Sequence, residues 1–447
     1  MNILRGIIGI IFLLGIAYLF SNNKKKINWK LVVNGLILQI IFAVLIIKGD
    51  SLGNFFAPLA WPKQAFNSIG YLFVVLLHFT SEGAQFIFGS LALSPGTENS
   101  MGYFFAFQVL PTIIFFACLM SVLYYLGIMQ RIVQAMAWIM AKFMGTSGAE
   151  SLSCAANIFV GQTEAPLMVK PFIKDLTNSE ILTIMVGGMA TIAGGVMASY
   201  VQMLSQTFAA TNNIPLNEAK ILFATHLLGA SCMAAPAGLL ISKILYPETL
   251  VPKTKGKVKV ELEKNSSNLI EAAAAGTSDG LNLALNVGAM LIAFIALIAL
   301  FNYLLGWVGD ITGLNAVIKA AYHQEFSIQF IFGFFLQYLA FIIGVPWESA
   351  MHFGSLLGTK VALNEFVAYS DMSNLIALKK LVDEKTILMA TYALCGFANF
   401  SSVAILVGGL TPLAPERRSD FASLGLKAVL GGSLATLMTA TLAGILF

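Results

Sequence analysis

The chain has 447 residues, of which 58% are hydrophobic and only 11% are charged, whereas roughly 25% of the residues in ordinary soluble domains are charged. Its 26 basic and 22 acidic residues leave a net charge of +4, which is too small and too dispersed to indicate nucleic-acid binding. These values exclude a soluble enzyme, a disulfide-rich secreted domain and a disordered chain. The composition instead predicts an all-α polytopic membrane protein.

Apolar segments long enough to cross a bilayer, about 20 residues each, recur along the chain. About eight transmembrane helices are predicted, near 3–20, 31–47, 103–127, 181–204, 219–242, 281–308, 387–410 and 422–447. The first segment is interpreted as a retained helix, because no small-residue cleavage site precedes the lysines at 24–26. The segment 53–75, with Pro58 and Pro62, is expected to be too broken to span and to lie as an interfacial helix at the membrane surface.

The basic residues predict the orientation, since cytoplasmic loops of membrane proteins are enriched in lysine and arginine. The lysines at 24–26 would be cytoplasmic, which places the N-terminus outside. Counting spans onward, the lysine-rich segment 253–264 and the arginines at 417–418 also fall inside. We expect 253–264 to be a solvated cytoplasmic loop. Three lysines between 379 and 385 fall outside and are the exception to this pattern.

Two apolar regions, 145–169 and 344–369, are interrupted by polar and small residues. Each contains a Glu-Ser pair near its start and a second glutamate further on, Glu164 or Glu365, and each precedes an apolar span with a polar centre. An odd number of spans separates the two copies, so they must face opposite ways. This pattern predicts an inverted repeat with two re-entrant hairpins, which is typical of secondary transporters. Two ordinary loops are the alternative.

The two glutamates are the most informative residues, because a carboxylate in the middle of a bilayer usually belongs to a site or has a partner. A hydrated position at the membrane interface remains the alternative for both. Glu150 and Glu348, near the starts of the two regions, are interpreted as helix caps or interfacial charges. The four cysteines lie in or beside apolar runs without CxxC spacing, so we expect free thiols and neither a metal site nor a disulfide.

Five motifs in this order resemble the concentrative nucleoside transporter family: GQTEAP at 161–166, TIAGGVMASY at 191–200, GVPWES at 344–349, LNEFVAY at 363–369 and GFANFSSVAI at 396–405. The resemblance covers the chain from about residue 28 onward and is closest to compact prokaryotic-type members. It implies a symporter that imports nucleosides such as uridine by alternating access, driven by a Na+ gradient. It further implies a multi-pass homotrimer in the cell (inner) membrane, with lipid as its surroundings and no nucleic-acid partner.

The resemblance also implies a division of each protomer into scaffold and transport parts. Scaffold helices and an interfacial helix would occupy 1–127, and the first transport repeat with its re-entrant hairpin 128–245. A cytoplasmic loop and a scaffold helix would occupy 246–310, and the second transport repeat 311–447.

Carried over residue by residue, the resemblance assigns the substrate site. Gln162, Thr163 and Glu164 would meet the nucleobase, and Val196 and Phe397 would pack against it. Glu365 would accept hydrogen bonds from ribose hydroxyls, with Asn399 and Ser402 completing the sugar contacts. A carboxylate that accepts two hydroxyls forms charge-assisted hydrogen bonds, and amide and hydroxyl groups suit the mixed edge of a base.

For the coupling ion, the resemblance implies the side chains of Asn157 and Thr191 and the backbone carbonyls of Val160 and Ile192. All four are neutral oxygen ligands, which favours Na+ over H+ because none is an obvious proton acceptor. No other cofactor is expected. An H+-coupled nucleoside symporter remains the alternative.

Other functions explain less of the sequence. Residues 145–148 read GTSG, as in intramembrane serine proteases, and His226 is a candidate base for Ser147. A Ser–His dyad requires the two side chains within hydrogen-bond reach, and it would explain neither the repeat nor the two glutamates, so we expect no enzyme. A carboxylate carrier is disfavoured because two acidic residues would repel an anion, and a passive channel would not need opposed hairpins.

Overall fold

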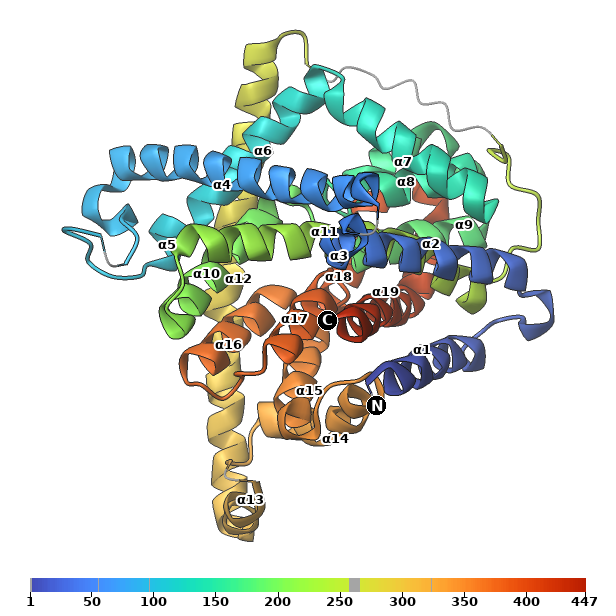
Figure 1. Ribbon diagram of the computed structural model, residues 1–447. Helices are drawn as coiled ribbons and strands as arrows, with labels where there is room; N and C mark the ends of the chain where they lie inside the picture. Colours follow the sequence, from blue (N-terminus) through green and yellow to red (C-terminus); the bar gives the residue numbers. More distant parts are fainter. Residues whose placement is uncertain (1, 55, 96, 257–265, 323) are drawn as a thin grey trace.

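The computed structural model describes residues 2–54, 56–95, 97–256, 266–322 and 324–447. Helices connected by short loops make up this part of the chain, and no strand occurs within it (Figure 1). Across the described residues, seven helical stretches are long and apolar enough to cross a membrane, or eight if one bent pair counts as a single span. The predicted all-α polytopic fold with about eight spans is confirmed.

The N-terminal third of the chain forms helices that precede the first hairpin. They are α1 (Asn2–Leu19), α2 (Trp29–Ile47), α3 (Gly49–Gly53), α4 (Trp61–Phe88), α5 (Phe105–Gln108) and α6 (Leu110–Tyr125), with short 3-10 turns at Lys24–Lys26, Ala57–Ala60 and Gly89–Ala92.

The expectation that prolines break the segment 53–75 is wrong. Pro58 and Pro62 lie in the first turns of a 3-10 helix and of α4, where the missing backbone N–H of proline leaves no hydrogen bond unmade. The helix α4 therefore continues without interruption for 28 residues. With its flanking turns, it is long and apolar enough to span a membrane by length and composition.

The longest helix, α12 (Leu269–Thr312), crosses the direction of α2, α4 and α11 and projects beyond them, with α13 (Leu314–Tyr322) at its end (Figure 1). It packs along α6. A Cβ at Gly280 would lie 2.8 Å from the Cβ of Ala117, so glycine permits this close approach. Most of α12 is otherwise exposed. The predicted loop 253–264 lies largely outside the described residues.

Two runs of helices repeat the same order. The first comprises α7 (Ile128–Met144), α8 (Gly148–Ala156), the 3-10 helix η4 (Ala165–Asp175), α9 (Asn178–Ala190), α10 (Gly194–Asn212) and α11 (Leu216–Leu245). The second comprises α14 (Ile328–Ile342), α15 (Trp347–Ala362), α16 (Glu365–Ala377), α17 (Glu384–Leu394), α18 (Phe400–Leu410), a 3-10 turn (Pro415–Arg417) and α19 (Arg418–Leu446).

Each run contains a helical hairpin, then a helix broken in its middle, then a long helix. The hairpins are α8–η4 and α15–α16, so both continue several residues past the predicted ends at 169 and 369. The breaks, at 191–193 and 395–399, fall at the polar centres predicted from the sequence. The long helices α11 and α19 pack against each other, and α11 is buried along its whole apolar window. The hairpins and breaks therefore surround a central pair of helices.

Candidate functional site

The two helix breaks lie against each other in the middle of the protein. Gly396, in the second break, adopts a φ of +135°, and a Cβ at this position would lie 2.8 Å from the carbonyl oxygens of Met189 and Ala190. Only glycine accommodates both the conformation and the contact. The backbone N–H of Gly194 donates to Phe159 O at 3.0 Å, which joins the first break to the tip of the first hairpin.

Glu365 is buried at the tip of the second hairpin, with 4% of its surface exposed. Its Oε1 accepts a hydrogen bond from Tyr200 Oη at 3.1 Å, and its Oε2 accepts one from Asn399 Nδ2 at 3.0 Å. Glu365 opens α16, where the helix dipole favours a negative charge. Carboxylate, phenol and amide thus come from three elements: the hairpin, α10 and the second break.

Tyr200 is the site residue that the sequence reasoning missed. It ends the TIAGGVMASY motif and lies four residues after Val196 in α10, on the same face of the helix. Its ring packs against Tyr369 with a centroid distance of 4.4 Å. A fully buried tyrosine needs a partner for its hydroxyl. The position of Tyr200 one helical turn after Val196 was the signal in the sequence that it faces the same site.

Hydrogen bonds continue from Asn399 to the first hairpin. Asn399 caps α18, and its Oδ1 accepts from the Ser402 N–H at 2.8 Å. Ser402 Oγ in turn accepts from Gln162 Nε2 at 3.3 Å. Gln162 lies at the tip of the first hairpin, so this path of side chains connects the two hairpin tips. Its members are the predicted site residues Gln162, Ser402, Asn399 and Glu365.

The other predicted substrate residues lie around this path without joining its hydrogen bonds. Thr163 packs against Gly409 of α18. Glu164 is exposed, and its carboxylate accepts from the backbone N–H of Gly161 at 3.2 Å. Val196 is buried in α10, and Phe397 is half-buried in the second break. In this conformation Glu164 and Glu365 therefore have different surroundings.

The predicted cation ligands lie at the first hairpin and the first break, which are joined by the hydrogen bond from Gly194 N–H to Phe159 O. Asn157 ends α8 and is 1% exposed, yet neither its amide oxygen nor its amide nitrogen has a hydrogen-bond partner. Thr191 ends α9 and donates its hydroxyl hydrogen to Gly187 O at 2.9 Å, which leaves the hydroxyl oxygen free to accept or coordinate. A buried amide without a partner is costly, so these residues fit a site for a small cation with neutral oxygen ligands.

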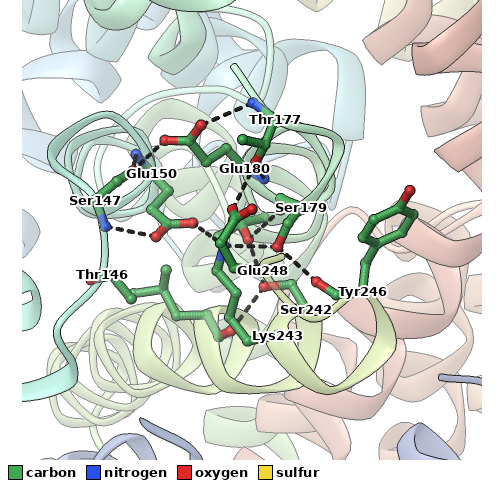
Figure 2. A network of polar contacts seen from close by, with 12 residues as sticks. Thr146, Ser147, Glu150, Thr177, Ser179, Glu180, Ser242, Lys243, Tyr246 and Glu248 are labelled. Atoms are coloured by element: carbon green, nitrogen blue, oxygen red, sulfur yellow. Dashed lines mark hydrogen bonds and ion pairs between the residues drawn. The ribbon is translucent and has the colours of Figure 1, made fainter. Parts of the chain in front are cut away.

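A second polar network lies at the start of α8, at the base of the first hairpin, and Figure 2 shows its residues. Lys243 of α11 forms an ion pair with Glu150 of α8 at 2.6 Å, and their side chains are 4% and 2% exposed. It also donates to Ser179 Oγ at 2.9 Å and lies 3.6 Å from Glu248. The network therefore ties the start of α8 to α9 and to the end of α11.

Ser147 belongs to this network, so the protease alternative is wrong. Its side chain caps α8 in a capping box with Glu150, and its hydroxyl donates to Glu180 Oε1 at 2.6 Å. The ring of His226 is hydrogen-bonded instead to Tyr392 Oη at 3.1 Å. Of the two interpretations of Glu150, a helix cap or an interfacial charge, the capping box supports the cap. The four cysteines are free, as predicted, and the described residues contain no cluster of three metal-binding side chains.

Family models of nucleoside transporters match most of the chain. The model for the Na+-dependent nucleoside transporter N-terminus matches residues 8–91, and the model for its C-terminus matches residues 226–444. A nucleoside recognition model, the gate domain, matches residues 106–207 and thus includes the first hairpin and the first broken helix.

Similar proteins support the same assignment. The nucleoside permease NupC of Helicobacter pylori is 41% identical, over 99% of this chain and 97% of its own. The sodium/nucleoside cotransporter 1 of Mus musculus is 38% identical, over 98% of this chain and 63% of its own. The inward-facing, substrate-bound structure of CNTnw is 39% identical with a TM-score of 0.84, covering 100% of this chain and 98% of CNTnw. An outward-facing CNTnw variant matches with a TM-score of 0.85 and the same identity, over 100% and 98% of the two chains. The chain therefore belongs to the concentrative nucleoside transporter family.

Proposed function

We propose that this nucleoside transporter is a Na+-coupled symporter that imports nucleosides such as uridine across the cell (inner) membrane. The observation that carries the proposal is the path of hydrogen-bonded side chains from Gln162 to Glu365, beside an amide at Asn157 that has no protein partner. The path offers donors and acceptors to a polar solute, and the unpartnered amide offers an oxygen to a cation.

Glu365 is proposed to bind the ribose. Two donors already hold its carboxylate, and a carboxylate accepts about four hydrogen bonds in all, which leaves capacity for two ribose hydroxyls. Asn399 and Ser402 complete the sugar contacts. Gln162, Thr163 and Glu164 are proposed to meet the base, with Val196 and Phe397 against its face. Gln162 Oε1 is buried and has no partner, which supports its role as an acceptor for a base N–H.

Na+ is proposed to bind Asn157 and Thr191 together with the carbonyls of Val160 and Ile192. Val160 lies past the end of α8 and Ile192 past the end of α9, where backbone carbonyls have no partner within the helix. The ion would join the first hairpin to the first broken helix and so order the neighbouring residue Gln162 for nucleoside binding. No other cofactor is proposed.

The two repeats are proposed to form a transport part that moves against a scaffold made of 1–127 and 246–310. CNTnw has been observed in inward-facing and outward-facing states, which supports alternating access here.

The hairpins are proposed to be re-entrant. The pattern of basic residues favours α4 at the membrane surface, because a crossing by α4 would move Arg131 and Lys142 to the outside. A homotrimer is proposed as well, and the exposed apolar length of α12 is consistent with a subunit or lipid contact.

Uptake of labelled uridine by purified protein in liposomes tests the proposal. We expect accumulation with an inward Na+ gradient, and none with a matched K+ gradient or with an inward proton gradient alone. Accumulation driven by protons would retain the nucleoside assignment and reject the sodium site. Absence of uridine uptake under every gradient would reject the proposed substrate.

A further inference from the structure

Lys360 is a buried cation that is not among the proposed ligands of the nucleoside or of Na+. It lies in α15 and is only 1% exposed. Among the described residues it makes no ion pair, whereas Lys243, which is 4% exposed, pairs with a carboxylate. Its Nζ instead donates to Ala393 O at 2.8 Å and to Thr436 Oγ1 at 3.2 Å. Burial of a charge without any partner is costly, and the partners of this ammonium are two neutral oxygens.

The oxygen ligands of Lys360 lie where helices end. Ala393 is in the last turn of α17, directly before the second break, and helix C-terminal carbonyls carry partial negative charge. Lys360 itself is in the last turn of α15, beside the tip that presents Glu365. The ammonium thus links the tip of the second hairpin to the end of the broken helix α17–α18.

The first repeat has the same arrangement without a lysine. There the hairpin helix α8 ends at Asn157 and the broken helix begins its gap at Thr191, and these residues are the proposed Na+ ligands. The long helix that closes each repeat contributes a hydroxyl: Ser231 of α11 donates to Ile158 O at 3.3 Å, and Thr436 of α19 accepts from Lys360. Hairpin end, helix break and closing helix therefore meet in both repeats.

We propose that the ammonium of Lys360 is a tethered cation, which holds the second hairpin against its broken helix as Na+ holds the first. This inference rests on the proposed function. It explains why one repeat offers an unpartnered amide and the other a lysine: a free ion binds in one and a covalently attached ion in the other. Lys360 is a positioning residue, since it fixes the hairpin tip that carries Glu365 and supplies positive charge near that carboxylate.

The substitution Lys360→Met tests the proposal, because methionine keeps an unbranched side chain of similar length and removes the charge. At saturating Na+ we expect the variant to bind uridine at least tenfold more weakly than the wild type by isothermal titration calorimetry. The Na+ concentration that half-maximally raises its melting temperature should stay within twofold of the wild-type value, since Asn157 and Thr191 are intact. Lys379→Met is the matched control: this lysine is exposed just beyond α16, and uridine binding should be unchanged.

Chemical rescue separates the charge from the space that the side chain fills. Lys360→Ala removes the three outer carbons and the ammonium, which correspond to propylammonium. We expect propylammonium to restore uridine binding at least fivefold, and propanol, of nearly the same shape, to restore none. Equal rescue by propanol, or wild-type affinity in Lys360→Met, would overturn the proposal.

A third variant keeps the test decisive if removal of the charge prevents folding. Thr436→Val removes one oxygen ligand while retaining the shape and the lysine. It should weaken uridine binding about threefold without changing the Na+ response, and an unchanged affinity would count against the tethered cation.

If wild-type protein does not bind uridine at all, the proposed function fails. If wild-type protein binds and the Lys360 variants bind equally well, only this inference fails.

Discussion

Glu365 connects three parts of the protein, so its charge is expected to matter more than its shape. In Glu365→Gln the side chain keeps its size, but a neutral amide replaces the carboxylate. One of the two carboxylate oxygens thereby becomes an N–H donor that faces Tyr200 or Asn399. Loss of a hydrogen bond to a charged group costs about 1.5–3 kcal/mol, which corresponds to an affinity about 10- to 150-fold weaker. Uridine titration of the purified variant at saturating Na+ measures this loss.

Glu348→Gln is the control, because Glu348 belongs to the same hairpin and is exposed at its start. Its uridine affinity should equal that of the wild type. Wild-type affinity in Glu365→Gln as well would remove the ribose role from Glu365.

Substitution of Asn157 distinguishes an effect on cation binding from an effect on folding stability. Because its amide group has no protein partner, Asn157→Ala breaks no hydrogen bond and should leave the melting temperature in Na+-free buffer nearly unchanged. In Na+ the variant should lose one oxygen ligand, so the Na+ concentration for half-maximal uridine uptake should rise at least tenfold. Uptake by proteoliposomes over a range of Na+ concentrations measures the shift. A large loss of stability without Na+, or an unchanged Na+ dependence, would contradict the assignment.

The residue types of the site were predictable from sequence, whereas their mutual contacts were not. Glu365 was singled out because a carboxylate inside an apolar segment requires a purpose, whereas the roles of Gln162, Asn399 and Ser402 were implied by the resemblance to the family. The direct contact between Tyr200 and Glu365 was not predicted, because it joins residues 165 positions apart through the packing of α10 on the second hairpin. The different surroundings of Glu164 and Glu365 were equally hidden, since both occur in similar sequence contexts.

At the scale of elements, the base of the first hairpin is held by a buried ion pair. The ion pair of Lys243 with Glu150 fixes the start of α8, close to Glu180 and Glu248. Lys243→Met would leave the buried carboxylate of Glu150 without its cation. Removal of one partner of a buried ion pair costs about 3–5 kcal/mol, so a marked fall in melting temperature is expected in detergent.

A double variant distinguishes the ion pair from general packing. Glu150→Gln combined with Lys243→Met removes both charges of the pair and should recover part of the stability that Lys243→Met loses. Lys427→Met, on the partly exposed side of α19, is the control and should melt like the wild type. If the double variant is no more stable than Lys243→Met, the ion pair does not hold the hairpin base.

Helix breaks were easier to predict than helix lengths. The runs at 191–195 and 396–402 combine glycine, small and hydrogen-bonding residues in the middle of apolar segments, and both breaks are present. In α4, by contrast, Pro58 and Pro62 were expected to interrupt a helix and instead precede it or lie in its first turn. A proline disrupts a helix only in its interior, and sequence alone did not show that these two lie at its start.

At the scale of the whole molecule, the two repeats place the proposed cation site and Glu365 on different hairpins, joined by hydrogen bonds and by the contact between the two breaks. An ion that orders the first hairpin should therefore improve nucleoside binding that uses both. Because binding free energies are linked, uridine must raise the affinity for Na+ by the same factor by which Na+ raises the affinity for uridine. We expect a factor of 5–150, the usual range for a coupling free energy of about 1–3 kcal/mol.

Calorimetric titration of uridine at several Na+ concentrations, and of Na+ at several uridine concentrations, measures both factors. Asn157→Ala should reduce both together, whereas Glu365→Gln should weaken uridine binding and leave the affinity for Na+ in the absence of nucleoside unchanged. If uridine affinity is independent of Na+, the two hairpins bind their ligands independently and the coupling scheme fails. A coupling factor above one in both titrations that falls in Asn157→Ala would support coupling between the proposed cation site and the nucleoside site.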